Sequence, residues 1–285
     1  MRFKMERNDM SDKTALGNRM KFYEKEQTPT RFMPHAPVCA RIDGKNFSRF
    51  TKDLERPFDA RLTKLMVLTT HHLVKETNAC IGYTQSDEIS LIWFTDDSRS
   101  QIFMDGKRDK MNSLLAAMTT SYFNLHLNEH LAEKAATCLE TGNCPIFDAR
   151  VWQVPTKQEA ANYLMWREHD ATKNSVSAAA QQHFSHNALH EKNGSEMQDM
   201  LHTVGVNWNN YPSSFKRGTY VQRREAITTF SSSELENLPK HHDARLNHDL
   251  AVLRHCVKTV TMPKCNSIAN YIDAIFDGAE PILKQ

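Results

Sequence analysis

The sequence has few features of a membrane, secreted or disulfide-bonded protein. No apolar run approaches the roughly 20 residues that a membrane-spanning helix needs. The N-terminal segment MRFKMERNDMSDKTALG lacks the apolar core of a signal peptide. The six cysteines are scattered without a CxxC pair, so we expect reduced residues, several of them buried, and no disulfide framework. These absences together predict an intracellular, cytoplasmic protein with no membrane contact.

The chain also carries little net charge. A formal charge of +2 is too small to indicate nucleic-acid binding by itself, although it permits a local basic patch. The 285 residues, 40% of them apolar, suit one large domain or one domain with appendages. Histidine is frequent, and His183, His186 and His190 are spaced to share one helical face. No carboxylate or thiol partner accompanies them, which favours a polar helix face over a zinc site.

The hydrophobic pattern divides the chain into three regions. Residues 1–35 form a polar lead-in, residues 36–224 carry the strongest patterns, and residues 225–285 form a C-terminal extension. The polar stretch 231–248 is the best boundary candidate. A short apolar helix is expected after it, over residues 249–260.

The central region is predicted to alternate strands and helices. The strands are expected over 37–43, 79–84, 89–94 and 145–155, and the helices over 58–77, 107–139 and 156–184. The opening order of strand, helix, strand, strand and helix is typical of a ferredoxin-like split unit. The predicted fold class is therefore α+β, with an antiparallel sheet covered by long helices and with additional C-terminal helices.

Two acidic residues stand where the predicted strands end. Asp43 closes the first strand in RIDGKNFSRF, and Asp87 lies in the connection QSDE between the next two strands. If these strands are neighbours, the two carboxylates meet at one sheet edge, where their repulsion favours a cation between them. Hard oxygen ligands suit Mg²⁺, and two ions about 3.5–4 Å apart would clamp the oxygens of a phosphoryl transfer.

The residues after Asp43 suit a phosphate. Gly44 would let its carbonyl approach an ion, and Lys45, Asn46 and Phe47 would offer a cation and backbone amides to a triphosphate. Taken alone, Asp43 is better explained by an Asp-Gly turn and Asp87 by a hairpin cap. Their combination in a split unit favours the metal site, because nucleotide-transferring polymerase palm domains use the same arrangement.

Several longer blocks resemble the tRNA-histidine guanylyltransferase family. In chain order they are RIDGKNFSRF, RPFDARL, GYTQSDEISLIW, FDARVWQVPTKQEAANYLMWREHDATKNSVSAAAQ and NWNNYPSSFKRGTYV. They span about residues 20–224, and the match of several rare blocks together makes the resemblance specific. It implies a polymerase-like palm that adds nucleotides to the 5′ end of tRNA.

The resemblance also implies roles for individual residues. The residues implied to be catalytic or to hold two Mg²⁺ ions are Asp43, Gly44 through its carbonyl, Asp87 and Glu88. Those implied to contact nucleotides are Asp43, Gly44, Lys45, Asn46, Phe47, Ser48, Ser86, Asp87, Lys107 and Lys110. Those implied to contact tRNA are Asn174, Asn207, Lys216 and Arg217.

The implied reaction runs in the 3′-to-5′ direction. ATP or GTP activates the 5′ monophosphate of a tRNA, and the 3′-hydroxyl of an incoming nucleotide then attacks that phosphate. GTP is the preferred nucleotide, or a template selects it. The implied partners are tRNA, nucleoside triphosphates and three further copies of the chain in a homotetramer.

One block departs from the eukaryotic members of the family. Thr172 stands where they carry the histidine of a His-Ile-Asn-Asn-Leu-Tyr-Asn block, while Asn174 is retained. DATKNSVSAAAQ is similar to the bacterial, archaeal and phage branch, whose members repair truncated tRNA 5′ ends. Both tRNA-histidine guanylylation and general 5′-end repair stay open, and a phage-encoded protein would act in the host cytoplasm.

Other interpretations also stay open at this point. A different palm-type nucleotidyltransferase, such as a cyclase, would act on free nucleoside triphosphates, although the Gly-Gly-Asp-Glu-Phe hairpin is absent. A non-catalytic tRNA-binding module would not need Asp43 and Asp87. Lys107 and Lys110 can also be the charged start of a solvated helix, whereas the resemblance favours phosphate contact.

Overall fold

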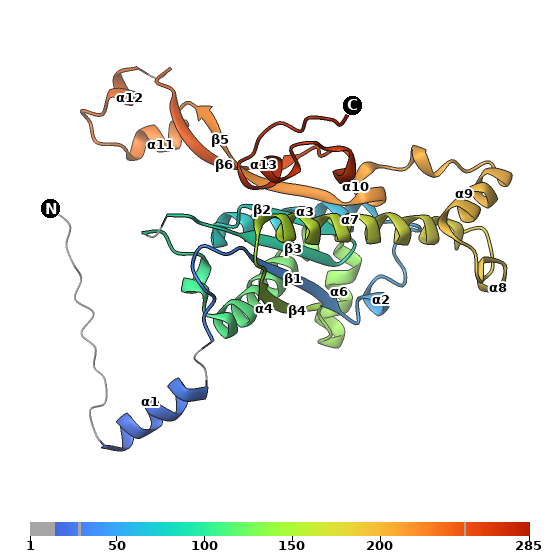
Figure 1. Ribbon diagram of the computed structural model, residues 1–285, viewed down its shortest axis with the longest axis horizontal. Helices are drawn as coiled ribbons and strands as arrows, with labels where there is room; N and C mark the ends of the chain where they lie inside the picture. The colour runs from blue at the N-terminus through green and yellow to red at the C-terminus, as the bar shows by residue number, and fades with distance from the viewer. Residues whose placement is uncertain (1–14, 28–29, 98, 248) are drawn as a thin grey trace.

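The fold is built around one antiparallel sheet. The computed structural model describes residues 15–27, 30–97, 99–247 and 249–285 (Figure 1). The strands follow the order β4-β1-β3-β2-β5-β6, and every neighbouring pair is antiparallel. Their bounds are β1 Val38–Lys45, β2 Ile81–Gln85, β3 Glu88–Trp93, β4 Ile146–Gln153, β5 Thr219–Thr228 and β6 Val252–Val260. The predicted α+β class is confirmed.

Helices cover both faces of the sheet. The longer ones are α1 Ala15–Gln27, α3 Ala60–Thr77, α4 Arg108–Leu125, α6 Ala132–Thr141, α7 Lys157–Ala180 and α9 Gly194–Thr203. The shorter ones are α2 Phe47–Phe50, α5 Leu127–His130, α8 His186–Leu189, α10 Ser213–Arg217, α11 Ser232–Asn237, α12 Asp243–Leu246 and α13 Tyr271–Phe276. None of these described helices is long and apolar enough to cross a membrane.

Alternation along β1 explains the two layers of helices. Val38, Ala40 and Ile42 point into the core that α3 and α4 share with the sheet. Cys39 points to the other face, where α7 and α13 pack. Both sets of side chains are fully buried, so the central strands are apolar on both faces. The sheet is thus a rigid middle layer, and its strand ends are held in place from both sides.

The helix predicted over 107–139 is wrong in its continuity. The chain leaves the α4 axis at His126 and again at Leu131, which gives α4, α5 and α6. Leu125 is 73% exposed, whereas Leu127 and Leu131 are buried in the core. The two breaks in the helix let these leucines reach the core, whereas one straight helix would leave them outside it. Likewise α7 ends at Ala180, before the predicted end at Phe184.

The helix predicted over 249–260 is also wrong. This segment forms β6, which pairs with β5 from Tyr220↔Val260 to Thr228↔Val252. Valine and threonine recur along it, and the partner strand supplies the hydrogen bonds that favour a strand over a helix. The boundary predicted between residues 224 and 225 falls within β5, and β6 belongs to the same sheet. The helices α11 and α12 lie between β5 and β6 in the chain, and Figure 1 shows them at its left side.

The lead-in contains one helix. α1 stands away from the sheet in Figure 1, and residues 1–14 and 28–29 lie outside the described residues. Leu16, Met20 and Tyr23 follow one side of α1 and are each about half exposed.

Close packing of β2 against α3 gives a test of the fold. A Cβ atom at Gly82 would lie 2.7 Å from Thr70 Cγ2 and 2.8 Å from Val74 Cγ2. We expect Gly82→Ala to lower the free energy of unfolding by about 1–3 kcal/mol through overpacking. Gly194→Ala is the matched control, because nothing lies within 4 Å of that position. Urea unfolding followed by circular dichroism measures both, and equal stability of the two variants would contradict the packing described.

Candidate active site

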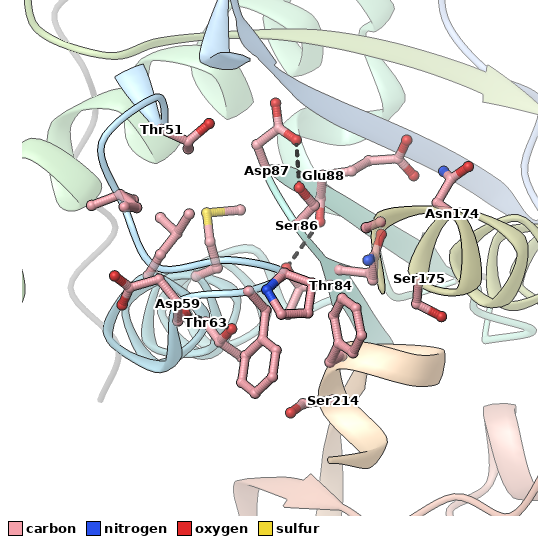
Figure 2. Close-up of a pocket in the computed structure, with 18 of the residues that line it drawn as sticks. Thr51, Asp59, Thr63, Thr84, Ser86, Asp87, Glu88, Asn174, Ser175 and Ser214 are labelled. Carbon is pink, nitrogen blue, oxygen red and sulfur yellow. Dashed lines mark hydrogen bonds between the residues drawn. The ribbon is translucent and has the colours of Figure 1, made fainter. Parts of the chain in front are cut away.

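Strand pairing brings Asp43 and Asp87 together. Asp43 of β1 lies opposite Glu88 of β3 in the ladder, so Asp87 precedes the residue paired with it. Ser86 and Asp87 form the tight turn between β2 and β3, and Ser86 takes a left-handed conformation with φ 54°. The Ser86 hydroxyl donates to Asp87 Oδ1 at 3.0 Å, which orients the carboxylate (Figure 2). The carboxylates therefore meet at one edge of the sheet, as the strand order predicted.

Gly44 lies against the same carboxylate. A Cβ atom there would come within 3.0 Å of Asp87 Oδ2 and 2.3 Å of the Phe47 ring. Any larger residue would push the turn or the ring away, so the close approach needs glycine. The Gly44 backbone and the Asp87 carboxylate consequently form one oxygen-rich corner.

Electrostatics in this corner favour a bound cation. Burial raises the pKa of Asp87 above its ordinary value, and the neighbouring Asp43 carboxylate raises it further. Hydrogen bonds from the Asp87 amide and from Ser86 oppose this rise only in part. Two crowded carboxylates with an adjacent carbonyl fit a hard divalent ion such as Mg²⁺. No group of three or more histidine, cysteine or acidic side chains suited to a metal occurs among the described residues.

Glu88 is engaged by an arginine. Arg167 of α7 donates to both its oxygens, with Nε–Oε1 at 2.6 Å and Nη2–Oε2 at 2.7 Å. Burial raises the pKa of Glu88, and the guanidinium of Arg167 lowers it. Bidentate pairs of this kind are strong and directional. The pair consequently ties α7 to the strand that follows Asp87.

A cavity of about 320 Å³ opens beside the carboxylates. Figure 2 labels ten of the polar side chains that line it: Thr51, Asp59, Thr63, Thr84, Ser86, Asp87, Glu88, Asn174, Ser175 and Ser214. Asp43, Glu55, Arg56, Gln85 and Arg167 line it as well. Its apolar wall includes Phe58 and Phe215, whose rings stack with centroids 4.9 Å apart and planes 24° apart. A flat ring beside hydroxyl and amide groups suits a nucleobase and its ribose.

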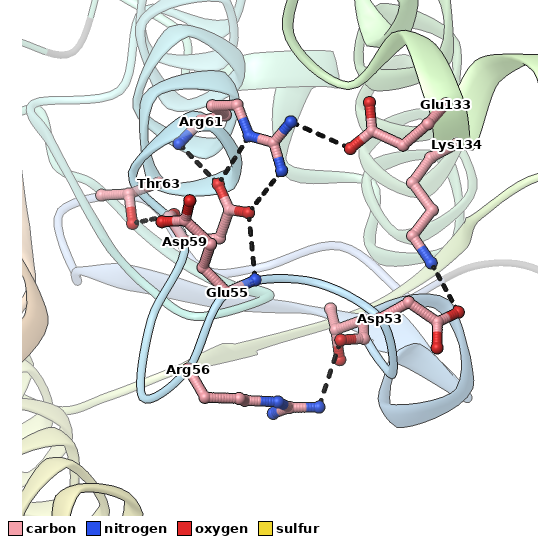
Figure 3. A network of polar contacts seen from close by, with 9 residues as sticks. Asp53, Glu55, Arg56, Asp59, Arg61, Thr63, Glu133 and Lys134 are labelled. Atoms are coloured by element: carbon pink, nitrogen blue, oxygen red, sulfur yellow. Dashed lines mark hydrogen bonds and ion pairs between the residues drawn. The ribbon is translucent and has the colours of Figure 1, made fainter.

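A polar network holds the loop over this cavity. Asp59 is 4% exposed, caps α3 through the Arg61 amide and accepts from the Arg61 guanidinium at 2.8 and 3.1 Å. Arg61 also pairs with Glu133 of α6 at 2.9 Å, and the Glu55 amide donates to Asp59 at 3.3 Å (Figure 3). The loop that lines the cavity is thus fixed to α3 and α6.

Comparisons with known proteins agree with this geometry. The family model described as tRNAHis guanylyltransferase matches residues 17–155. The solved structure of a bacterial tRNA(His) guanylyltransferase-like protein in complex with ATP is 35% identical, with a TM-score of 0.66. The match covers 74% of this chain and 87% of that one. The chain belongs to the tRNA(His) guanylyltransferase family.

Two further relatives extend the comparison. A bacterial tRNA(His) guanylyltransferase-like protein in complex with GTP is 28% identical with a TM-score of 0.67, covering 89% of this chain and 94% of that one. An uncharacterised protein of Acanthamoeba polyphaga mimivirus is 29% identical over 226 residues, 73% of this chain and 77% of that protein. As a member of this family, the chain is a nucleotidyltransferase, and the predicted family is confirmed.

In this tRNA(His) guanylyltransferase family member, Lys107 and Lys110 lie far from the carboxylates of Asp43 and Asp87. Thr120 of α4 accepts a hydrogen bond from the Phe147 amide, and Phe147 pairs with Gly44. Thirteen residues of helix separate Lys107 from Thr120, which is about 20 Å of rise. Within one chain, the two lysines and the carboxylates are therefore at opposite ends of the sheet.

The other predicted residues lie in several different surroundings. Lys45 and Asn46 face a second groove on the far side of the loop, Ser48 is exposed, and Phe47 is buried against Phe123 and Phe147. Asn174 lines the cavity. Nearby, Lys216 Nζ donates to the Asn209 carbonyl at 2.5 Å, the Asn207 side chain accepts from the Asn209 amide, and Arg217 donates to Ser213.

The sequence patterns did not identify Arg167, Phe58 or the Arg61–Glu133 pair as parts of the site. Pro57 and Asp59 fit a catalytic loop and a helix start equally well, and in the structure Asp59 caps α3. The Arg61–Glu133 pair joins residues far apart in the chain, which no local pattern indicates. The predicted histidine face is not formed by one helix, because His183 follows the end of α7 and His186 begins α8.

Acid should weaken the Asp59 network. The hydrogen-bonded Arg61 guanidinium holds the pKa of Asp59 below its ordinary value of about 3.9. The stability that the ionised Asp59 carboxylate gives the fold is complete above its unfolded-state pKa of about 3.9. It disappears as the pH falls through the lower pKa of the folded state. We expect Asp59→Asn to reduce the free energy of unfolding by about 1–3 kcal/mol at pH 7, and the difference to shrink below about pH 4.

Asp97→Asn is the matched control for this experiment. Asp97 accepts from the Arg99 amide and guanidinium in the same arrangement, but at an exposed site. Urea unfolding at several pH values should show little effect of this variant. If both variants behave alike, burial of the Asp59 network contributes nothing.

Proposed function

We propose that this protein is a Mg²⁺-dependent enzyme that adds nucleotides to the 5′ end of tRNA in the 3′-to-5′ direction. The observation that carries the proposal is the corner of Asp43, Gly44 and Asp87 beside a cavity of nucleoside size. Membership of the tRNA(His) guanylyltransferase family supports the substrate, and the solved relatives in complex with ATP and GTP support the nucleotides.

Asp43, Asp87 and the Gly44 carbonyl would hold the two ions. When bound, Mg²⁺ would neutralise the charge on the phosphates that approach this corner. Burial and, to a smaller extent, the Asp43 carboxylate raise the pKa of Asp87, and a bound cation would oppose both effects.

The chain's own contribution is positioning. The Phe58–Phe215 stack and the hydroxyl groups would orient the nucleoside, and Asp43 and Ser86, which line the same cavity, would face its triphosphate. The attacking 3′-hydroxyl and the activated 5′ phosphate then need only be aligned, because phosphoryl transfer requires little covalent chemistry from the protein. We assign no side chain as nucleophile or general base.

Glu88 is assigned a positioning role in this scheme. Both its oxygens accept hydrogen bonds from Arg167, so the carboxylate already has its partners. It sits in the ladder directly opposite Asp43. Its pair with Arg167 of α7 would keep the start of β3, and with it Asp87, at a fixed distance from β1.

Basic and amide groups around the site would contact the RNA. Asn174 of α7 lines the cavity, and Asn207, Lys216 and Arg217 lie on or shortly before α10, whose Ser214 and Phe215 also line it. Lys107 and Lys110 are too distant to reach a triphosphate held at Asp43 in the same chain. We assign these two lysines to phosphates elsewhere on the tRNA or to the site of another copy.

General 5′-end repair is the favoured biological role. Thr172 stands where eukaryotic members carry histidine, and DATKNSVSAAAQ is similar to the repair branch.

A homotetramer in the cytoplasm is the proposed form of the enzyme. The half-exposed apolar side of α1 supports association of copies. The mass measured in solution by light scattering tests the oligomeric state.

A 5′-extension assay tests the function and its metal corner together. Wild type with Mg²⁺, ATP for activation, all four nucleoside triphosphates for addition and a truncated, 5′-monophosphorylated tRNA should give products longer by one or more nucleotides. We expect Asp43→Ala and Asp87→Ala to lower the rate by several orders of magnitude, about 10³-fold or more, because each removes an ion ligand. Asp109→Ala, at the far end of α4, is the control and should retain activity.

Substrate choice in the same assay separates the two roles. Repair predicts extension of several truncated tRNAs with nucleotides that complete the acceptor pairing. Guanylylation predicts addition of G to tRNA-histidine alone. Absence of any extension across several tRNAs and all four nucleotides contradicts the proposed function.

A further inference from the structure

A second hollow lies on the other side of the loop that follows Asp43. It has a volume of about 420 Å³ and is bordered by the end of β1, by α2, by α6 and by the start of β4. In Figure 1, α2 and α6 lie together at this end of the sheet. We call it the α2–α6 groove, and its lining includes Lys45, Asn46, Arg49, Lys134, Asn143 and Cys144.

The charges in the α2–α6 groove do not cancel. Asp53, an acid of the lining, is paired with Lys134 at 3.5 Å, and Lys134 also lies over the Phe50 ring at 5.6 Å (Figure 3). Lys45 and Arg49 are exposed, and no hydrogen bond or ion pair engages their side chains within the described part of the chain. The groove consequently offers two uncompensated cations.

Neutral hydrogen-bonding groups stand beside these cations. The side chains of Asn46 and Asn143 line the groove and have no hydrogen-bond partner among the described residues. Thr137 and Thr141 also line the groove from the exposed side of α6, where their hydroxyls donate to the Glu133 and Thr137 carbonyls. Arginine, lysine, asparagine and threonine are the side chains that commonly contact the sugar–phosphate backbone of nucleic acids.

The position of the groove suits a strand of RNA that ends at the carboxylates. Lys45 follows Asp43 by two residues on β1, so their Cα atoms lie about 6–7 Å apart. The cavity assigned to the nucleoside lies on the other side of the loop. Its wall includes Thr51, Leu54 and Glu55. A polynucleotide and a nucleotide can therefore approach the same corner from opposite sides of the loop.

We propose that the α2–α6 groove binds the sugar–phosphate backbone of the RNA strand whose 5′ end is extended. This inference rests on the proposed function and adds the path of the RNA to it. Arg49 binds a backbone phosphate, and Asn143 donates to the same strand. Inorganic pyrophosphate, which has similar charge, is the competing occupant that the test must separate.

Binding of tRNA, measured by fluorescence anisotropy without turnover, tests Arg49. We expect Arg49→Gln to weaken the affinity for a 3′-labelled, 5′-monophosphorylated tRNA about three- to tenfold, and to lower the slope of log affinity against log salt by about 0.7–0.9. The affinity for ATP should stay unchanged. Lys52→Gln is the matched control, because Lys52 is an exposed cation on the same loop that does not line the groove.

Cys144 provides an independent footprint. Among the six cysteines, Cys144 is the exposed residue, and it lines the groove. Cys256 of β6 is partly exposed and does not line the groove. We expect saturating tRNA to slow the alkylation of Cys144 by a maleimide at least several-fold and to leave Cys256 unaffected. Peptide mass spectrometry quantifies both sites in the same sample, and the Cys144 measurement needs no variant.

The outcomes separate the possible failures. If Arg49→Gln binds tRNA like wild type and Cys144 stays reactive in the complex, the groove does not carry RNA, even when 5′ extension proceeds. If Arg49→Gln loses inhibition by pyrophosphate but keeps tRNA affinity, the occupant is pyrophosphate and the proposal is overturned. If wild type binds no tRNA, the proposed function fails together with the groove.

Discussion

The antiparallel pairing of β1 with β3 is the constraint on which the rest of the site depends. It sets Asp43 opposite Glu88 and leaves Asp87 in the turn, with its carboxylate against the Gly44 backbone. A shift of one residue in this register would turn Asp43 to the other face of the sheet. Packing on both faces of β1 opposes such a shift, since Ile42 would then leave the core that it shares with α3 and α4 for the opposite face, where Cys39 now packs. Core packing and the placement of the carboxylates therefore have the same origin.

Three ties then fix the surroundings of this corner. Arg167 clamps Glu88 to α7, Asp59 joins the cavity loop to α3, and Arg61 extends that connection to Glu133 of α6. The loop after Asp43 thus has a nucleoside-sized cavity on one side and a basic groove on the other. An enzyme that joins a nucleotide to the 5′ end of an RNA must admit two substrates to one site, and the proposed paths of the two lie on opposite sides of this loop.

Local patterns predicted the part of the molecule that depends on local chemistry. Strands β1 to β4, the helix after Pro57 and the proximity of Asp43 to Asp87 follow from apolar runs, turn residues and strand order. The strand β6 did not follow, because its preference is decided by β5 and not by its own apolar content. The same holds for the breaks at His126 and Leu131 and for the Glu88–Arg167 pair, which depend on contacts between distant segments. Family resemblance, and no pattern of residues, indicated the direction of synthesis.

The central claim is that Asp43, Gly44 and Asp87 form the metal corner of a nucleotidyltransferase. Its most direct test is Mn²⁺ binding, measured by electron paramagnetic resonance in the presence of a non-hydrolysable ATP analogue. The account predicts two ions per wild-type chain at saturation, and loss of at least one in Asp87→Asn with an unchanged circular dichroism spectrum. Equal Mn²⁺ stoichiometry and affinity in wild type and Asp87→Asn would contradict it.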